Sequence, residues 1–594
     1  MSDRKKFVIY QVFTRLFGNT CTANVPWGTL EENGVGKFAD FTPKALQAIR
    51  ELGVTHIWYT GVPHHAMVTD YSAFGIRPDH PQVVKGRAGS PYAVKDYYNV
   101  NPDLASDPTR RLDEFRALVR RTHKAGMKVV IDIVPNHVAR NYEGASTPKG
   151  HRPLGADDDD TQVFRVDNDF YYLPGEAFRV PEWRNGYRPL GGKPHPALAA
   201  PYQEIPAKWT GNGSRLSRPD MDDWYETVKV NYGVTPEGAH AFDPLPWEYR
   251  EKNHSAHLAF WREREVPPSW IKFRDIALYW LKQGVDGFRY DMAEMVPVEF
   301  WSYLNSHIKQ QNPEAFLMAE VYDPGKYRDY IGLGKMDYLY DKVELYDSLK
   351  HIVKGYGWTD HIPVVLQDQQ GIESHLLRFL ENHDEHRIAA PEFAGDPDLA
   401  RPAMVVTATL GPAPVLVYFG QEVGEPAAEQ AGFGHPGRTS IFDYIGVPHH
   451  QRWMNGGAFD GGALSPKERS LRDFHRRLLN FTIESPALTG AFRDIHYYNK
   501  EHTEGYDHRI YSFVRWLGED RLIIACNFES GRSYRVNLGV PPEIIREWGL
   551  KDGRYELREK LNGIPSAPLL IEGGRGSVQL ELAPLESAIL RLGE

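Results

Sequence analysis

Short apolar runs alternate with amphipathic stretches along most of this chain, and this alternation limits the possible fold more than any other feature. Three runs, Phe7–Phe13, Val54–Tyr59 and Lys128–Val134, are rich in β-branched and aromatic residues and predict strands. Residues 41–51 and 112–125 lie between them and carry apolar residues at helical spacing. Strands that are apolar almost throughout and alternate with helices are typical of a parallel sheet covered by helices.

The alternation stops after His137. From about residue 138 to 265 the sequence is rich in Pro, Gly, Asp and aromatic residues and has no sustained helical periodicity. A structureless loop of this length would be unusual inside a compact protein. The sequence therefore predicts an irregular domain, inserted after the third strand and covering residues 138–245.

The alternation then resumes with a helical pattern at Ile271–Leu281 and further apolar runs. Five more strands are expected, at residues 285–290, 316–321, 336–340, 377–380 and 414–419. With the first three they make eight, the strand count of a (β/α)8 barrel. The expected fold class is therefore α/β, a (β/α)8 TIM barrel with an irregular domain inserted after strand three.

The last part of the chain has a different pattern. From about residue 494 onwards, short alternating segments such as Arg509–Trp516 are separated by Gly, Pro and Asn. This pattern predicts a C-terminal antiparallel β-sandwich. A chain of 594 residues is also too long for a single core. We expect the barrel to comprise residues 1–137 and 246–490, the inserted domain 138–245, and the sandwich 491–594.

Composition excludes several classes of function. The net charge is −10 and no dense block of Lys or Arg occurs, so nucleic acid is not an expected partner. Two cysteines, Cys21 and Cys526, make neither a disulfide framework nor a metal-spaced cluster. No apolar run reaches the ~18 residues of a membrane span, and the N-terminus lacks the apolar core of a secretion signal. These features predict no membrane partner and a cytoplasmic location, and they leave the oligomeric state open.

Acidic residues occur where the expected strands end. The third strand ends in DIVPNH, the fourth leads into GFRYD, the fifth ends in AEVY and the seventh in ENHD. The acids in these segments that end the strands are Asp132, Asp291, Glu320 and Asp384. Active residues of a (β/α)8 barrel lie at the carboxyl ends of its strands, so these four acids are expected around one rim.

These four segments resemble, in the usual order, the four signature regions of the α-amylase superfamily, glycoside hydrolase family 13. GPAPVLVYFGQE at 411–422 is similar to the family's last barrel strand, and SPYAVKDYY at 90–98 resembles its strand-two loop. The resemblance implies a retaining hydrolase of α-1,4-glucosidic bonds in starch, glycogen or maltodextrins. That chemistry needs one ionised and one protonated carboxyl beside the bond. By resemblance, Asp291 is the nucleophile and Glu320 the general acid/base.

The resemblance also assigns the residues around this pair. Asp384 takes the third acidic position and holds sugar hydroxyls beside the reacting carbon, and Asp132 orients Arg289. The stretch 218–232 is expected to form a wall of the cleft. The expected substrate-binding residues are Tyr92, which stacks on the sugar, together with His137, Arg289, His383 and Arg438.

Arg289 and Asp291 stand two residues apart on a strand, so their side chains share one face. The guanidinium is expected to keep Asp291 ionised through its charge and hydrogen bonds. Glu320 is expected to be the carboxyl that keeps its proton, because of burial or neighbouring carboxylates. Two acids with opposite preferences would then divide the chemistry between them.

The resemblance further implies a structural calcium ion with Asn136 among its ligands. After Asp291, however, the sequence reads MAEM, whereas many α-amylases carry a Lys-His pair at the positions of Glu294 and Met295. The backbone carbonyl of Met295 would still serve a metal, but calcium takes six to eight oxygens and the sequence does not supply such a set. No cofactor is expected for the chemistry itself, and calcium stays open.

Two other functions share part of this pattern. A 4-α-glucanotransferase or an α-1,6-acting enzyme of the same family would use the same three acids and differ in acceptor or linkage. A non-catalytic glucan-binding protein could keep the fold, but such a protein loses the carboxylates, and all three are present here. Fold alone would not decide among these functions.

Overall fold

Eight parallel strands close into a barrel at the centre of the protein. The computed structural model describes residues 5–427, 430–563 and 565–593. The strands are hydrogen-bonded in the order β1-β14-β13-β12-β11-β10-β5-β2, and β2 returns to β1. Their bounds are β1 Val8–Phe13, β2 His56–Thr60, β5 Lys128–Ile133, β10 Gly287–Tyr290, β11 Phe316–Ala319, β12 Tyr338–Tyr340, β13 Leu376–Phe379 and β14 Val415–Tyr418. All eight expected strands are present, so the predicted (β/α)8 barrel is confirmed.

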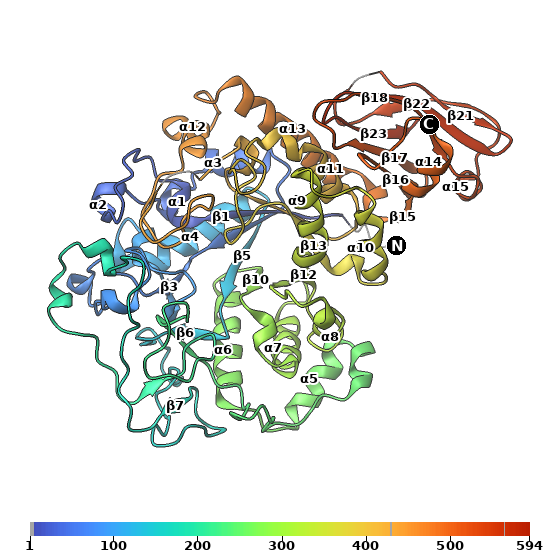
Figure 1. Ribbon diagram of the computed structural model, residues 1–594. Coiled ribbons are helices and arrows are strands. Elements are labelled where there is room, and N and C mark those ends of the chain that lie inside the picture. Colours follow the sequence, from blue (N-terminus) through green and yellow to red (C-terminus); the bar gives the residue numbers. More distant parts are fainter. Residues whose placement is uncertain (1–4, 428–429, 564, 594) are drawn as a thin grey trace.

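Helices surround the barrel (Figure 1). Their apolar faces pack on the strands; α6 (Pro268–Lys282), for example, buries Trp270, Phe273 and Trp280 completely. The other helices that follow or flank barrel strands are α3 Pro43–Arg50, α4 Arg111–Lys124, α5 His254–Arg262, α7 Val298–Gln311, α8 Tyr327–Gly332, α9 Asp347–Val353, α10 His361–Asp368, α11 Arg401–Thr409 and α13 Pro466–Glu484. Shorter helices are α1 Thr14–Phe17, α2 Leu30–Asn33 and α12 Pro448–Met454.

The strand register decides which side chains meet at the rim. Arg289 of β10 lies beside Asp132 of β5 and beside Met318 of β11. Paired residues on neighbouring parallel strands point to the same side of the sheet. Arg289 and Asp132 therefore lie side by side on the same side of the sheet. Glu320 directly follows the end of β11, the other strand that pairs with β10.

The segment after β5 is an irregular insert, as the sequence predicts. Two short antiparallel pairs organise it, β6 (His137–Ala139) with β9 (Thr227–Lys229) and β7 (Tyr172–Leu173) with β8 (Ala207–Lys208). A further pair, β3 (Pro63–His65) with β4 (Val94–Val100), follows β2 and buries His64 and His65. Figure 1 shows the insert, in teal, on one side of the barrel.

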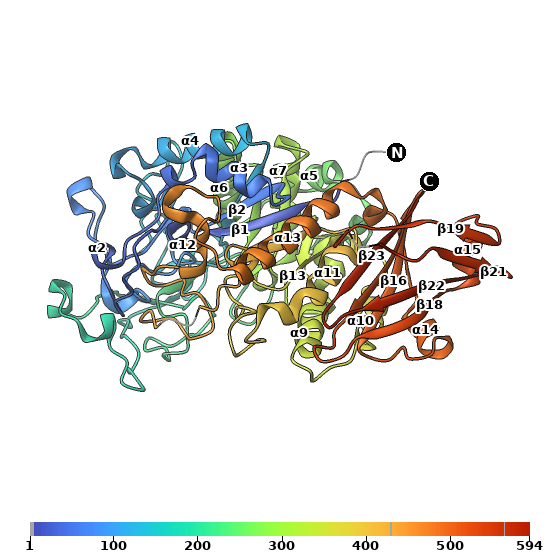
Figure 2. The same cartoon turned by 90° about the horizontal axis from the view of Figure 1, so that it is seen from above.

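The C-terminal part folds into two antiparallel sheets, and this confirms the predicted sandwich. One sheet contains β15 Ala491–Asp494, β16 Ile510–Leu517, β17 Asp520–Asn527, β23 Ser587–Leu592 and β20 Leu557–Glu559. The other contains β18 Tyr534–Val540, β22 Arg575–Leu582, β21 Leu569–Glu572 and β19 Gly553–Tyr555, with α14 His496–His502 and α15 Pro542–Glu547 alongside. Figure 2 shows these sheets at one end of the molecule. The domain boundaries proposed above stay predictions.

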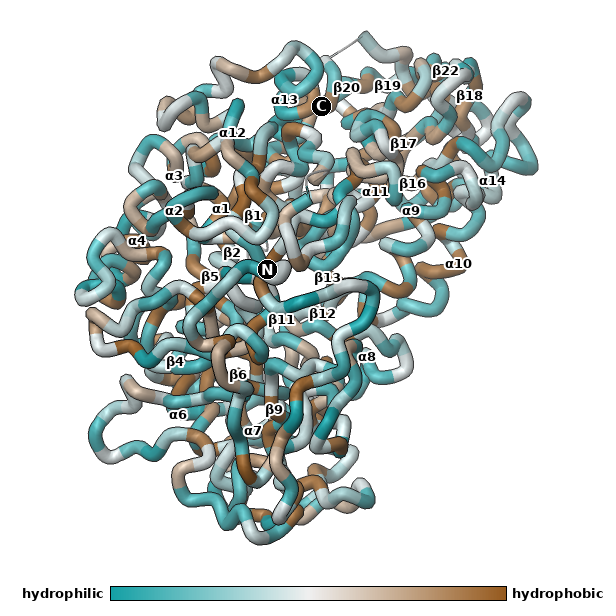
Figure 3. Tube along the Cα trace, turned by 60° about the vertical axis from the view of Figure 1, so that its left-hand side comes forward, coloured by the Kyte–Doolittle hydropathy of each residue, from teal (hydrophilic) through white to brown (hydrophobic). Residues whose placement is uncertain are grey.

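Hydrophobic residues concentrate inside the molecule. Figure 3 shows brown stretches around β1 and hydrophilic stretches along the outer loops. The strand β1 is buried along its whole length. None of the described helices combines the length and the apolar composition needed to cross a membrane.

Candidate active site

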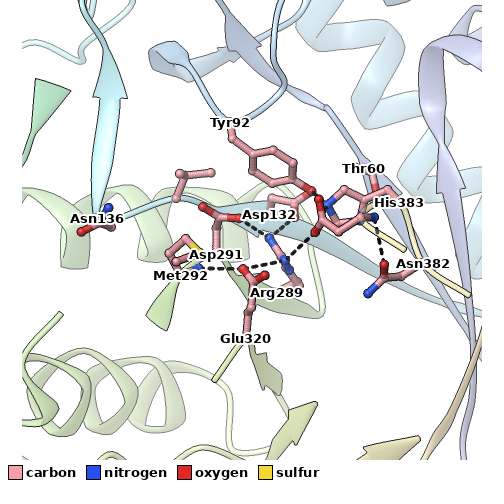
Figure 4. A network of polar contacts seen from close by, with 12 residues as sticks. Thr60, Tyr92, Asp132, Asn136, Arg289, Asp291, Met292, Glu320, Asn382 and His383 are labelled. Carbon is pink, nitrogen blue, oxygen red and sulfur yellow. Dashed lines mark hydrogen bonds and ion pairs between the residues drawn. The ribbon is translucent and has the colours of Figure 1, made fainter. Parts of the chain in front are cut away.

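A fully buried guanidinium, that of Arg289, organises the carboxyl ends of the strands (Figure 4). Its Nη1 donates to Asp291 Oδ1 over 2.6 Å, and its Nη2 donates to Glu320 Oε2 over 2.9 Å. Its Nε donates to the hydroxyl of Tyr340 over 3.2 Å. The predicted neighbours Arg289, Asp291 and Glu320 therefore meet, and one positive charge serves two carboxyl groups.

The backbone after Asp291 helps to hold Glu320. Met292 has a φ of 45°, in the left-handed region that residues with side chains rarely adopt. In this turn its N–H donates to Glu320 Oε2 over 2.9 Å. Unusual backbone angles persist where the surroundings enforce them, often at functional sites. The same oxygen of Glu320 thus accepts hydrogen bonds from Arg289 and Met292.

The pKa of Asp291 depends on burial and on more than one neighbouring charge. Burial raises the pKa of Asp291 well above its usual value, and the nearby charge of Glu320 acts in the same direction. Arg289 opposes this rise but does not cancel it. Arg289 therefore acts on Asp291 in the expected direction, and the ionised state of Asp291 during the reaction stays a prediction. Both carboxyls bind the same guanidinium, so the charge on Glu320 bears directly on Asp291.

Asp132 lies behind Arg289, as predicted. Its Oδ1 is 3.7 Å from Nη1 of Arg289, and its Oδ2 accepts a hydrogen bond from Trp58 Nε1 over 3.0 Å. Burial raises the pKa of Asp132 to about 6, although Arg289 acts against the rise. Its position is consistent with the orienting role expected for it, which stays a prediction.

Tyr92, His383 and Asp384 form the neighbouring part of the site. The Tyr92 hydroxyl contacts Nε2 of His383, and the two rings stack with centroids 5.2 Å apart. Asp384 Oδ2 lies 3.0 Å from the same Nε2 and 4.0 Å from Arg289 Nη2. Burial acts to raise the pKa of Asp384, but His383, and then Arg289 and Arg438, lower it to about 2. Asp384 is therefore ionised at neutral pH.

The remaining predicted residues lie around this centre. His137 is buried at the start of β6, and burial lowers the pKa of its imidazole to about 3, so it is neutral at neutral pH. Arg438 is exposed, and its positive charge helps to lower the pKa of Asp384. Asn136 stands apart from the Arg289 network in Figure 4 and contacts the insert instead.

The pocket above these groups is lined by part of the stretch 218–232 and by further residues that the sequence did not indicate. Trp224, from the stretch 218–232, lies with its ring centroid 5.2 Å from that of His137. Glu226 is buried and pairs with Lys85 over 2.9 Å. The wall expected from 218–232 is therefore there. The other lining residues outside the predicted set are Ser90, Thr227, Met292, Tyr322, Ile441 and Phe442.

Glu294, which stands where many α-amylases carry a different residue, binds the backbone that follows Glu320. Its Oε2 accepts hydrogen bonds from the backbone N–H groups of Tyr322 and Asp323, over 3.0 and 2.9 Å. The Tyr322 hydroxyl interacts with the carboxylate of Glu320. Glu294 therefore holds the loop that follows the proposed acid/base. Its position three residues after Asp291 was the only sign in the sequence that Glu294 lies near the site. Its hydrogen-bond partners become clear only in the fold.

A closed parallel barrel with paired carboxyls at its strand ends defines the protein as a (β/α)8-barrel enzyme of the glycosidase type. The family model described as "Alpha amylase, catalytic domain" matches residues 11–188 and 207–454, which is more than half of the chain. The chain therefore belongs to the α-amylase family, glycoside hydrolase family 13, and it is an α-glucan hydrolase of that family.

Its relatives are distant. It is 22% identical to neopullulanase 2 of Thermoactinomyces vulgaris, over 99% of this chain and 77% of the relative. It is 20% identical to α-amylase 3 of Dictyoglomus thermophilum, over 88% of this chain and 85% of that protein. Among solved structures, the noncanonic maltogenic α-amylase AmyB from Thermotoga neapolitana matches with a TM-score of 0.59 and 18% identity, over 100% of both chains. The structural match supports the fold.

The shared guanidinium predicts the pH dependence of the reaction. Burial and the charge of Glu320 raise the pKa of Asp291, so the site holds a proton beyond the range of a free carboxyl, about pH 4. If turnover needs a proton at this site, activity is lost as the pH rises past the range in which the site holds it. We expect the alkaline limb of kcat/KM on maltoheptaose well above pH 4. A limb near pH ~4 would mean that burial and neighbouring charge do not hold a proton at the site.

Glu294→Gln is expected to lower kcat by roughly tenfold with little change in KM, because the acceptor of two backbone hydrogen bonds loses its charge and binds the loop more weakly. Glu299→Gln, in the first turn of α7, is the matched control and should behave as the parent. Steady-state kinetics on maltoheptaose would test this. Equal kcat for Glu294→Gln and the parent would show that the loop after Glu320 does not need Glu294.

Proposed function

We propose that this enzyme hydrolyses α-1,4-glucosidic bonds of starch, glycogen or maltodextrins by double displacement, with retention of the anomeric configuration. One observation carries the proposal. The carboxyls of Asp291 and Glu320 bind the same buried guanidinium beside one pocket. Two carboxyls bound to one guanidinium beside one pocket suit a reaction that needs a nucleophile and an acid together.

In the first half of the reaction, an oxygen of Asp291 attacks the anomeric carbon. The bond between that carbon and the glycosidic oxygen breaks, and Glu320 transfers its proton to the leaving oxygen. The proton must therefore lie on Glu320 in the reactive complex. Arg289 favours this distribution because it donates its shortest hydrogen bond, 2.6 Å, to Asp291.

In the second half, water replaces the departed sugar. Glu320, now ionised, takes a proton from the water as its oxygen attacks the anomeric carbon, and Asp291 leaves as a carboxylate. The proton on Glu320 is restored, so the enzyme returns to its starting state. Two inversions at the same carbon give retention.

Residues around the pair would hold the sugar. Asp384, ionised at neutral pH, would accept hydrogen bonds from the sugar hydroxyls, and His137 and His383 would donate to them. The ring of Tyr92 and the indole of Trp224 offer flat surfaces for stacking. Arg438 would contribute mainly charge at the entrance. An α-glucan substrate is supported by relatives named neopullulanase, α-amylase and cyclomaltodextrinase.

A time course on maltoheptaose that resolves product lengths and fresh anomers is the experiment that tests this function. Only shorter sugars, released in the α-anomeric form, are expected. Products longer than seven units would mean that a sugar, not water, takes the glycosyl group, and the enzyme would then be a glucanotransferase. Cleavage confined to branched or α-1,6-linked substrates would replace the proposed linkage.

Two variants assign the roles. Glu320→Gln keeps the shape of the acid/base without its proton and should lower kcat by roughly 10²–10⁴-fold. Asp291→Asn should lose at least as much. Glu314→Gln is the matched control, because Glu314 is exposed and precedes β11, whereas Glu320 follows the strand's other end. Parent-like activity in both site variants would remove Asp291 and Glu320 from the reaction.

A further inference from the structure

The amino group of Lys229 lies where the insert meets the barrel rim. Lys229 ends β9 and is paired with His137 of β6 across the antiparallel register. Its Nζ donates a hydrogen bond to Oδ1 of Asn136. The same Nζ donates to the backbone oxygen of Met295 over 3.2 Å. One lysine therefore joins the segment after β5 to the segment after β10.

Asn136 Oδ1 and the Met295 carbonyl are the two oxygens that the resemblance to α-amylases assigned to a calcium ion. In this protein both accept from Lys229. The rest of Asn136 is also engaged, because its Nδ2 donates to the Gly211 carbonyl over 2.9 Å and its own carbonyl accepts from Val230 N over 3.1 Å. Both oxygens of Asn136 therefore already accept a hydrogen bond from the protein.

The acidic ligands that calcium requires are missing as well. Calcium takes six to eight oxygens, several of them from carboxylates. The described contacts of the Lys229 amino group are with Asn136 and Met295, and none of the ion pairs formed by described residues involves it. In the described ranges, no three His, Cys, Asp or Glu side chains gather to hold a metal ion. The nearest acid in sequence to Met295, Glu294, binds the backbone after Glu320.

We propose that the amino group of Lys229 replaces a structural calcium ion at this junction, so that the insert is held on the barrel without a metal. The nitrogen lies between the two oxygens that a cation would bridge and makes the same link between the same two segments. A protonated or a neutral amino group has enough N–H donors for two acceptors, so the link does not depend on its charge.

The link also bears on the catalytic loop. Met295 ends the short turn Ala293–Met295 that begins after Met292, and the Met292 N–H donates to Glu320. Lys229 therefore holds one end of a segment whose other end contacts the proposed acid/base. In the insert, Trp224 and Glu226, which line the pocket, directly precede β9, the strand that Lys229 ends. Lys229 therefore fixes the position of the pocket wall relative to the catalytic loop.

Chelation of the parent enzyme tests the proposal without any substitution. Protein dialysed against EDTA and then against chelator-free buffer should contain no stoichiometric calcium by elemental analysis. Its Tm and its activity on maltoheptaose should equal those of protein kept in calcium chloride. One calcium per chain, or a Tm that falls with EDTA and returns with calcium, would overturn the proposal.

A substitution tests the role of the amino group itself. Lys229→Met keeps the aliphatic stem and removes the donor, and it should lower Tm by about 2–4 °C or more, equally with and without calcium. Lys193→Met is the matched control, because Lys193 also lies in the insert. Its side chain is partly exposed, and its ion pair with Glu32 is long, at 3.8 Å, and exposed to solvent. A parent-like Tm for Lys229→Met would show that the junction does not rely on Lys229. If this variant does not fold, the chelation experiment still decides.

Discussion

The buried guanidinium of Arg289 is the interaction on which the rest of the site depends. A charge without water is costly unless it is paired and hydrogen-bonded. Arg289 meets this requirement with Asp291 and Glu320 in direct contact and Asp132 close behind. The planar guanidinium offers several donors in fixed directions, which a lysine would not. It therefore both neutralises and orients the two carboxyls that the proposed reaction uses.

The barrel makes this arrangement from residues far apart in the sequence. Strands β5, β10 and β11 bring Asp132, Arg289 and Glu320 to one rim, and the parallel register sets Arg289 beside Asp132. The insert then adds a wall that the strands alone do not provide. Trp224 and Glu226 come from it, and Lys229 fastens it to the segments after β5 and β10. A rigid barrel and an irregular insert thus share the work of forming one pocket.

Much of this could be predicted from the sequence because the signals are local. Apolar runs and helical periodicity located all eight strands, and the residues that end them indicated Asp132, Asp291, Glu320 and Asp384. The irregular insert has no period, so nothing in the sequence indicated that Lys229 would contact Asn136 and Met295. Lys85, Ile441 and Phe442 reach the pocket from loops outside the motifs, and only the fold brings them there.

The protonation of Asp291 was harder to predict for a different reason. The expectation weighed only the attraction between Arg289 and its neighbour two residues away. Burial removes water from Asp291, and Glu320 draws on the same guanidinium, so the balance moves toward the protonated form. Both effects depend on residues that the sequence separates and the barrel brings together.

The central claim is that Asp291 forms the bond to the sugar while Glu320 moves the proton. Trapping of the covalent intermediate tests it most directly. Glu320→Gln would be incubated with an α-maltosyl fluoride, whose leaving group needs no acid, and digested for peptide mass spectrometry. The account predicts one maltosyl group per chain, attached to the peptide that carries Asp291. A maltosyl group on another residue, or none while the fluoride is consumed, would contradict it.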